Sequence, residues 1–239
     1  DGLTKRYGET LAVDGISFAV PRGAVVALLG GNGAGKTTTI AMLLGLLIPT
    51  AGSIRVLGHD MARDRFAALA RMNFSSPYVA LPARLSVAEN LRVYGHLYGV
   101  AGLERRIAEL AGELDLNSLL DRPAGQLSAG QKTRVALAKS LINRPDVLLL
   151  DEPTASLDPH AKREVEALMA DFAASHGAAG PAHPVTMVFS SHNLGQVKRL
   201  ASRVIYMEHG RLVADLPVHD FFNGPLPEAA RLFVKGELV

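Results

Sequence analysis

A glycine-rich segment is the part of this sequence best suited to hold a phosphate. It reads Gly30, Gly31, Asn32, Gly33, Ala34, Gly35, Lys36, Thr37, with Thr38 following. Glycine has no side chain, so the backbone N–H groups of such a segment can approach a triphosphate closely. Lys36 adds a positive charge for the β- and γ-phosphates, and the Thr37 hydroxyl is placed to ligate Mg²⁺. We predict a nucleoside triphosphate site here; an ordinary glycine-rich turn is the alternative.

Two adjacent carboxylates follow a short apolar run. Val147 to Leu150 is continuous and apolar, as expected of a strand buried on both faces, and Asp151 and Glu152 come next. An unpaired carboxylate at the end of a buried strand would be costly, so we predict that Asp151 holds Mg²⁺, through a water. Glu152, at the carboxyl edge of the sheet, can polarise the water that attacks the γ-phosphorus and is the candidate general base. A solvated strand end is the alternative.

A second candidate anion site lies in the run Leu127, Ser128, Ala129, Gly130, Gln131. Ser128 has the features of a helix N-cap, and the helix after it has a buried stripe at Val135, Ala138, Leu141 and Ile142. Unpaired N–H groups and the helix dipole favour anions at an exposed N-terminus. One chain does not need two such sites for one triphosphate. By itself the pentapeptide also fits an ordinary capped helix.

Strands and helices must hold these groups in a fixed order. The predicted strands are residues 15–20, 24–29, 52–57, 147–150, 185–189, 204–207 and 211–214. The second of them runs directly into the glycine segment, and a helix follows from Lys36. Gly210 is expected in a hairpin turn between the predicted strands 204–207 and 211–214.

Residues 86–143 are predicted to be nearly all helix. Ser86 and Glu89 have the spacing of a capping box, and a further helix follows Gly102. We expect 86–143 to be a helical subdomain inserted into a core of residues 1–85 and 144–215, which carries the predicted triphosphate site. Residues 216–239 are expected to form a C-terminal helical tail.

The glycine segment, the run 127–131 and the run 146–153 resemble, in this order, the ATP-binding cassette (ABC) ATPases, the motor subunits of ABC transporters. The resemblance covers nearly the whole chain. It implies an α/β fold: a P-loop NTPase core with a parallel-rich sheet, N-terminal antiparallel β strands and an inserted helical subdomain. It also implies ATP and Mg²⁺ as ligands. Two subunits would close head to tail, with Ser128, Gly130 and Gln131 of one reaching the ATP held by the other.

Three further residues gain a role only through this resemblance. His192 follows the predicted strand 185–189 and matches the family's switch histidine, which reads the γ-phosphate and holds the attacking water. Asp158 matches the loop that passes between the two sites, although an ordinary turn is the alternative. Tyr7 matches the aromatic side chain that stacks on adenine, although packing is the more common use of a lone tyrosine.

The sequence departs from the family pattern at three places. Gly31 stands where proline is usual, and Ala129 where glycine is usual; neither change removes a needed donor. The family's glutamine between core and helical lobe is missing, because no glutamine precedes Gln126. The corresponding stretch, residues 73–78, offers Ser75 or Ser76 instead, and either hydroxyl is a weaker candidate contact for the metal.

Composition limits the partners. The chain has 239 residues, with 25 lysines and arginines against 23 acidic residues, and the basic residues are scattered, so no nucleic-acid footprint is evident. With no cysteine, disulfides and thiolate metal sites are excluded.

No apolar stretch reaches the ~20 residues of a spanning helix. We expect a cytoplasmic protein, peripheral on the inner face of the cell membrane. Because the chain begins at Asp1 rather than methionine, we also expect a trimmed edge strand.

The expected function is primary active transport. The partners implied are a second copy of the chain, or a second ABC ATPase, together with transmembrane permease subunits. Residues 45–58 and 87–100 most resemble the ABC-2 efflux branch, whereas the tail, with Phe221, Phe222 and residues 236–238, resembles importer ATPases. Export is therefore predicted, with an importer ATPase, or a non-transport ABC ATPase acting on ribosome or DNA, as alternatives. A non-hydrolysing regulator would be expected to have lost Lys36, Glu152 or His192.

Overall fold

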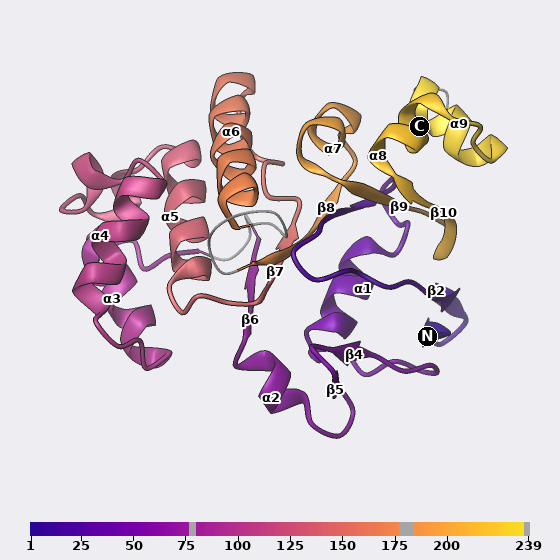
Figure 1. Cartoon of the computed structure of the whole chain (residues 1–239), viewed down its shortest axis with the longest axis horizontal. Coiled ribbons are helices and arrows are strands. Elements are labelled where there is room, and N and C mark those ends of the chain that lie inside the picture. Colours follow the sequence, from indigo (N-terminus) through magenta and orange to yellow (C-terminus); the bar gives the residue numbers. More distant parts are fainter. Residues whose placement is uncertain (77–79, 177–183, 237–239) are drawn as a thin grey trace.

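A six-stranded sheet forms the centre of the computed structural model, which describes residues 1–76, 80–176 and 184–236 (Figure 1). Its strand order is β10-β9-β3-β8-β7-β6. These strands are β3 (Val25–Leu29), β6 (Met72–Ser75), β7 (Val147–Asp151), β8 (Thr186–Ser191), β9 (Arg203–Glu208) and β10 (Arg211–Pro217). All neighbours pair in parallel except β9 and β10. The carboxyl ends of β3, β7 and β8 therefore meet at one edge, where open α/β sheets bind ligands.

The remaining elements surround this sheet. The helices are α1 (Lys36–Leu43), α2 (Arg65–Leu69), α3 (Val87–Leu97), α4 (Leu103–Glu113), α5 (Ala129–Leu141), α6 (Pro159–His176), α7 (Leu194–Leu200), α8 (Val218–Asn223) and α9 (Glu228–Lys235), with short 3₁₀ turns at Asn117–Leu119 and Ala124–Gln126. Two antiparallel pairs, β1 (Leu3–Tyr7) with β2 (Thr10–Ile16) and β4 (Arg55–Val56) with β5 (His59–Asp60), lie on the side of the molecule opposite α3 and α4 (Figure 1). The α/β fold with N-terminal antiparallel strands is thus confirmed.

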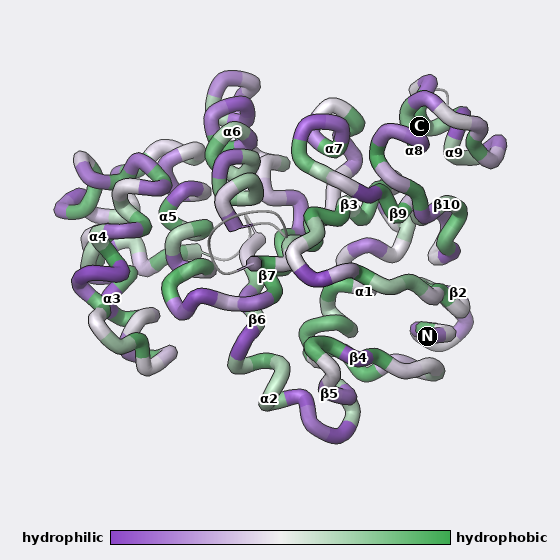
Figure 2. Tube along the Cα trace, in the orientation of Figure 1, coloured by the Kyte–Doolittle hydropathy of each residue, from purple (hydrophilic) through white to green (hydrophobic). Residues whose placement is uncertain are grey.

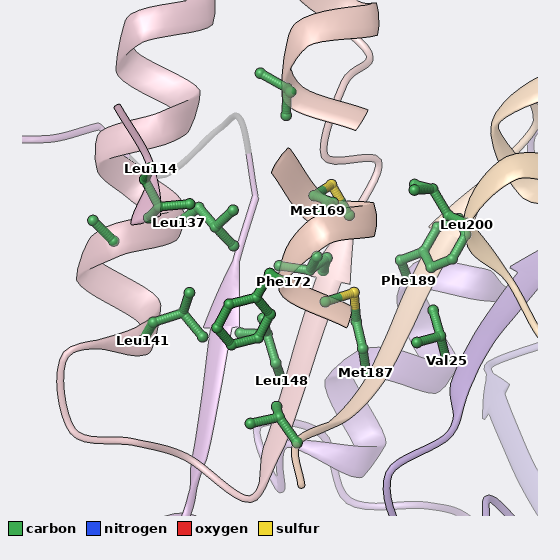
Figure 3. Packing of buried hydrophobic residues seen from close by; sticks show 14 of the residues in the cluster. Val25, Leu114, Leu137, Leu141, Leu148, Met169, Phe172, Met187, Phe189 and Leu200 are labelled. Atoms are coloured by element: carbon green, nitrogen blue, oxygen red, sulfur yellow. The ribbon is translucent and has the colours of Figure 1, made fainter. Parts of the chain in front are cut away.

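Two hydrophobic cores cover the two faces of the sheet. Because side chains alternate along a strand, Leu148 of β7 joins the core under α5, α6 and α7, whereas Leu149 joins the core around α1. Figure 3 shows Leu141 of α5 and Phe172 of α6 gathered over Leu148. Figure 2 shows hydrophobic residues concentrated along the central strands. Both faces of the sheet are buried, which explains the continuous apolar runs in the sequence.

Helix starts and the last hairpin agree with the sequence predictions. Ser86 accepts a hydrogen bond from the backbone of Glu89 and the Glu89 side chain accepts one from the backbone of Ser86, so the capping box that opens α3 is confirmed. The hairpin between β9 and β10 turns at His209 and Gly210, both with positive φ. None of the helices in the described part of the chain is long and apolar enough to span a membrane.

Two predicted strands have the wrong bounds. The expected strand 15–20 is β2, which runs from Thr10 to Ile16, because its partner β1 pairs Leu3 with Ile16 and Tyr7 with Thr10. The expected strand 52–57 shrinks to β4, a two-residue strand that turns at Leu57 and Gly58 to pair with β5. In both cases the apolar alternation in the sequence extends beyond the residues that have a partner strand. Hydrogen bonding to the partner strand decides the bounds of a strand.

Candidate nucleotide site

The glycine segment forms the loop between β3 and α1, and its glycines are required for different reasons. A Cβ on Gly30 would lie 2.3 Å from the Met207 carbonyl oxygen, so only glycine fits the space. Gly33 and Gly35 have φ values of 77° and 95°, which non-glycine residues rarely adopt. Gly31 has neither constraint, since a Cβ there would meet nothing within 4 Å. The backbone of this loop is therefore shaped by three of its four glycines.

Lys36 is buried at the start of α1 and bound to the loop itself. Its ammonium donates hydrogen bonds to the carbonyls of Gly30, at 2.9 Å, and Gly31, at 3.0 Å. The ammonium also lies 3.6 Å from Oε1 of Glu152. A lysine ammonium has three donors, so two anchor the side chain and the third remains for an anion. The loop thus presents a fixed positive charge beside the candidate base.

Asp151, at the end of β7, is buried and held by two hydroxyl groups. Thr37 donates to its Oδ1 at 3.3 Å, and Ser190 of β8 donates to the same oxygen at 2.5 Å. Thr37 and Asp151 are 114 positions apart in the chain, yet they are brought together as predicted. Both supply hard oxygen donors of the kind Mg²⁺ prefers.

Glu152 lies between a cation and an imidazole. Its Oε1 is 3.6 Å from Nζ of Lys36, and its Oε2 is 3.1 Å from Nδ1 of His192, which is on the loop after β8. The backbone of Glu152 has φ of 47°, the left-handed region, and its N–H donates to the Ser190 hydroxyl at 2.9 Å. The structure therefore assembles Lys36, Glu152 and His192, which come from three segments far apart in the sequence.

A buried amide joins the two loops that carry Glu152 and His192. Gln196 of α7 donates through Nε2 to the Thr154 hydroxyl at 2.8 Å and accepts from the Ser191 hydroxyl at 2.7 Å. The Ser191 oxygen in turn accepts the N–H of Asn193 at 3.0 Å. This network and Ser190 were not predicted, because a serine or glutamine in the sequence carries no signal of which strand lies beside it.

The N-terminus of α5 has the predicted cap. Ser128 Oγ accepts the N–H of Gln131 at 3.2 Å, and Oε1 of Gln131 accepts the N–H of Ser128 at 3.0 Å. A Cβ on Gly130 would lie 2.9 Å from Cβ of Ala161, so this glycine lets α5 approach α6 closely. Ser128 and Ala129 are exposed. In the single chain, the side chains of Ser128 and Gln131 serve the helix start itself.

Asp158 and Tyr7 have local roles in the single chain. Oδ1 of Asp158 accepts the N–H groups of Ala161, at 3.0 Å, and His160, at 2.9 Å, at the start of α6. These backbone hydrogen bonds lower the pKa of the Asp158 carboxyl. Tyr7 ends β1 with half of its surface exposed, and the Lys5 ammonium lies 5.1 Å from its ring centre. Its ring face is thus available to a cation and to solvent.

The serines proposed to replace the missing glutamine lie at the end of β6. Ser75 and Ser76 line a cavity of about 20 Å³ together with Thr133 of α5, on the side of β6 that faces the helices. Residues 77–79, which complete the stretch, lie outside the described residues. Of the remaining loop residues, Asn32 and Gly33 are exposed, Ala34 is buried and Thr38 is half-buried.

The donor set fits a magnesium ion held mainly by nucleotide and water. Among residues 1–76, 80–176 and 184–236, no group of three or more His, Cys, Asp or Glu side chains could hold a metal. Mg²⁺ needs no such group, since it keeps several waters and is held by one or two protein oxygens plus phosphate oxygens. Thr37 and Asp151 supply those oxygens beside the phosphate loop.

Comparison with known proteins identifies the family. Residues 13–155 match the family described as ABC transporter. The chain belongs to this family, as an ATP-binding subunit. It is 36% identical to the Nod factor export ATP-binding protein I of Ralstonia nicotianae over 225 residues, which is 93% of this chain and 68% of that protein. It is 38% identical to the daunorubicin resistance ATP-binding protein DrrA3 of Streptomyces coeruleorubidus, over 90% of this chain and 66% of that protein.

Solved structures agree with this assignment. The structure titled cbiO1 from Clostridium perfringens, part of the ABC transporter complex cbiONQ, superposes with a TM-score of 0.80 at 27% identity, covering 100% of this chain and 94% of that one. A structure titled as the ATP binding subunit of an ABC transporter gives a TM-score of 0.79 at 26% identity. This ABC chain is therefore an ATP-binding protein with ATPase activity, and the site just described is its candidate catalytic centre.

Proposed function

We propose that this chain is the motor subunit of an exporter, and that two subunits close head to tail around two ATP·Mg²⁺ to drive transport through a membrane partner. The observation that carries the proposal is the position of Glu152, between the Lys36 ammonium and the His192 imidazole. A carboxylate next to a phosphate-binding lysine and within hydrogen-bond distance of an imidazole is suited to orient and deprotonate a water.

Each residue of the nucleotide site has a separate role in this proposal. The loop N–H groups and Lys36 hold the triphosphate, while the carbonyls of Gly30 and Gly31 keep the ammonium in place. An incoming γ-phosphate competes with Glu152 for the third ammonium donor, which frees the carboxylate to accept a proton from water. Thr37 and Asp151 would hold Mg²⁺, which would supply positive charge for the β- and γ-phosphates. His192 orients the water and the γ-phosphate.

Dimerisation is supported by the second helix N-terminus. Ser128 and Ala129 at the start of α5 are exposed, and one triphosphate is already provided for at the start of α1. Helix N-termini attract anions. On this proposal Ser128, Gly130 and Gln131 of one subunit close over the nucleotide of the other. Asp158 lies in the loop that would pass between the two sites, and Tyr7 stacks on adenine.

Export and a membrane partner are supported by the relatives. Those named above are described as export or drug-resistance ATP-binding proteins, and one structural neighbour is part of a transporter complex. We propose that residues 1–85 and 144–215 form the ATP-binding core, that the helical subdomain of residues 86–143 contacts the permease, and that 216–239 is an appended tail. The subunit would then lie on the inner face of the membrane. Ser75 or Ser76 takes the place of the missing glutamine.

Glu152→Gln tests the proposal. The amide keeps the size of the side chain but cannot accept the proton, so ATP·Mg²⁺ turnover should fall by at least about a hundredfold while ATP still binds. Light scattering should show a dimer with ATP·Mg²⁺ and a monomer with ATP and EDTA. A monomer at saturating ATP·Mg²⁺ would contradict the head-to-tail dimer, and undiminished turnover would remove Glu152 as the base.

Glu113→Gln is the matched control. Glu113 is an exposed carboxylate at the end of α4, in the helical part of the chain. The same chemical change there should leave turnover and nucleotide-dependent dimerisation unaltered. If Glu113→Gln behaved like Glu152→Gln, the effect would come from net charge rather than from the site.

A further inference from the structure

A single hydroxyl connects the two acidic residues of the site. Ser190 is fully buried on β8, and Asp151 is its register partner on β7. The Ser190 hydroxyl donates to Oδ1 of Asp151 at 2.5 Å and accepts the N–H of Glu152 at 2.9 Å. A hydroxyl has one hydrogen to donate, so the bond to Asp151 fixes its rotation and leaves a lone pair directed at the N–H of Glu152.

The residue that Ser190 holds has an unfavourable backbone conformation. Glu152 has φ of 47°, and a non-glycine residue persists in this region only when its surroundings hold it there. Two backbone hydrogen bonds do so: the N–H donates to Ser190, and the carbonyl accepts the N–H of Ala155 at 3.0 Å. In this conformation the carboxylate lies between Lys36 and His192. Without the Ser190 hydroxyl, the N–H of Glu152 would lose its acceptor while the residue remains in a strained conformation.

The neighbouring serine has a separate task. The hydroxyl of Ser191 is equally buried and also makes two hydrogen bonds, but its partners are Gln196 and Asn193. Ser190 is thus the member of the pair that contacts the residues of the hydrolytic site.

We propose that Ser190 is a positioning residue for ATP hydrolysis, which sets the geometry of Glu152 by accepting its N–H while Asp151 orients the hydroxyl. The inference rests on the proposed role of Glu152 as the base. The hydroxyl of Ser190 is bound to Asp151 and Glu152, and on this proposal its effect on the reaction passes through Glu152. It follows that removing the hydroxyl should slow the hydrolytic step and leave ATP binding in place.

Ser190→Ala is the first test. We expect kcat to fall about tenfold to a hundredfold, because a small displacement of a reacting group costs on that order. The KM and Kd for ATP, and the Mg²⁺ concentration for half-maximal turnover, should stay within about threefold of the parent. Unchanged kcat would overturn the proposal. A large rise in the Mg²⁺ requirement would also overturn it, because Ser190 would then act on the metal through Asp151.

Thr186→Val is the matched control for folding. Thr186 is buried on the same strand, and its hydroxyl accepts the N–H of Gly23 at 3.0 Å, far along β8 from Ser190. Both substitutions remove the acceptor of one backbone N–H, and Ser190→Ala also removes a donor to the buried Asp151, so Ser190→Ala should lose at least as much thermal stability as Thr186→Val. Only Ser190→Ala should lose turnover. If Thr186→Val lost as much turnover, the effect of Ser190→Ala would be one of stability alone.

A double-mutant cycle asks whether Ser190 acts through Glu152. In the Glu152→Gln background, Ser190→Ala should lower the residual turnover by less than about threefold, since the base is already gone. A full tenfold or larger further loss would refute the proposed route. Independently of activity, hydrogen exchange of the Glu152 amide in nucleotide-free protein should be faster in Ser190→Ala and unchanged in Thr186→Val. Unchanged exchange in Ser190→Ala would contradict the hydrogen bond on which the proposal depends.

The two proposals can fail separately. If Glu152→Gln keeps its turnover, the assignment of the base is wrong. If Glu152→Gln is inactive while Ser190→Ala turns over at the parental rate, only the role of Ser190 is wrong. Ser190→Thr, which keeps a hydroxyl at the same position, should recover most of the turnover lost in Ser190→Ala.

Discussion

Replacing Lys36 by methionine should weaken ATP binding by a calculable amount. Methionine keeps most of the buried volume and removes the ammonium. Truncating one partner of a buried charged contact costs about 2–5 kcal/mol. On the proposed binding mode, Lys36 would keep its hydrogen bonds to the carbonyls of Gly30 and Gly31 and exchange its contact with Glu152 for one with phosphate. The net loss should therefore lie near the lower end, about 2–3 kcal/mol, which corresponds to about 30- to 150-fold in Kd.

Isothermal titration with ATP·Mg²⁺ measures this change directly. Lys139→Met is the matched control, because Lys139 and Lys36 each have 7% of their surface exposed. The Lys139 ammonium lies over the ring of Tyr94, 4.8 Å from its centre, on the helical side of the chain. Lys139→Met should leave Kd unchanged. A Kd for Lys36→Met within threefold of the parent, in a folded protein, would refute the placement of the triphosphate.

Three further predictions concern the stability of the fold. Gly31→Ala should be tolerated and stabilise the fold by about 0.4–1 kcal/mol, whereas Gly33→Ala, at positive φ, should destabilise it; urea unfolding measures both. Burial raises the pKa of Tyr206 to about 12, so between pH ~10 and ~12 the unfolded chain loses a proton that the folded chain keeps. Tyr206 by itself should lower the free energy of unfolding by about 1.4 kcal/mol per pH unit over this window, and Tyr206→Phe should remove that contribution. Asp146 is buried and pairs with two arginines, at 2.9 and 2.6 Å. Asp146→Asn should lower the free energy of unfolding by about 2 kcal/mol, measured by urea unfolding. An unchanged free energy would show that these ion pairs contribute nothing to stability.

Local signals in the sequence predicted local structure well. The cap at Ser128 and the capping box at Ser86 depend only on residues three positions apart, so the sequence alone predicts them. The buried strands β7 and β8 have continuous apolar runs because both faces of the sheet are covered. The phosphate loop was predicted from its glycines and Lys36, and the pair Asp151 and Glu152 because it ends such a strand.

What could not be predicted depends on strand register. Ser190 meets Asp151 only because β8 lies beside β7 at one register, and a partner 39 positions away leaves no trace in local composition. The same reason explains the strand bounds that were wrong, since β2 ends at Ile16, where its ladder with β1 ends. Gly130 was predicted to touch nucleotide. The structure gives it a packing reason as well, because α6 leaves no room for a side chain there.

Cysteine cross-linking tests the shared nucleotide site most directly. The chain has no cysteine, so Asn32→Cys and Ala129→Cys, both at exposed positions, would introduce the only two thiols. In the Glu152→Gln background, the account predicts a covalent dimer under mild oxidation with ATP·Mg²⁺, and none without nucleotide or in either single-cysteine variant. Monomeric protein with ATP·Mg²⁺, under conditions where both thiols react with a maleimide before nucleotide is added, would contradict the head-to-tail arrangement.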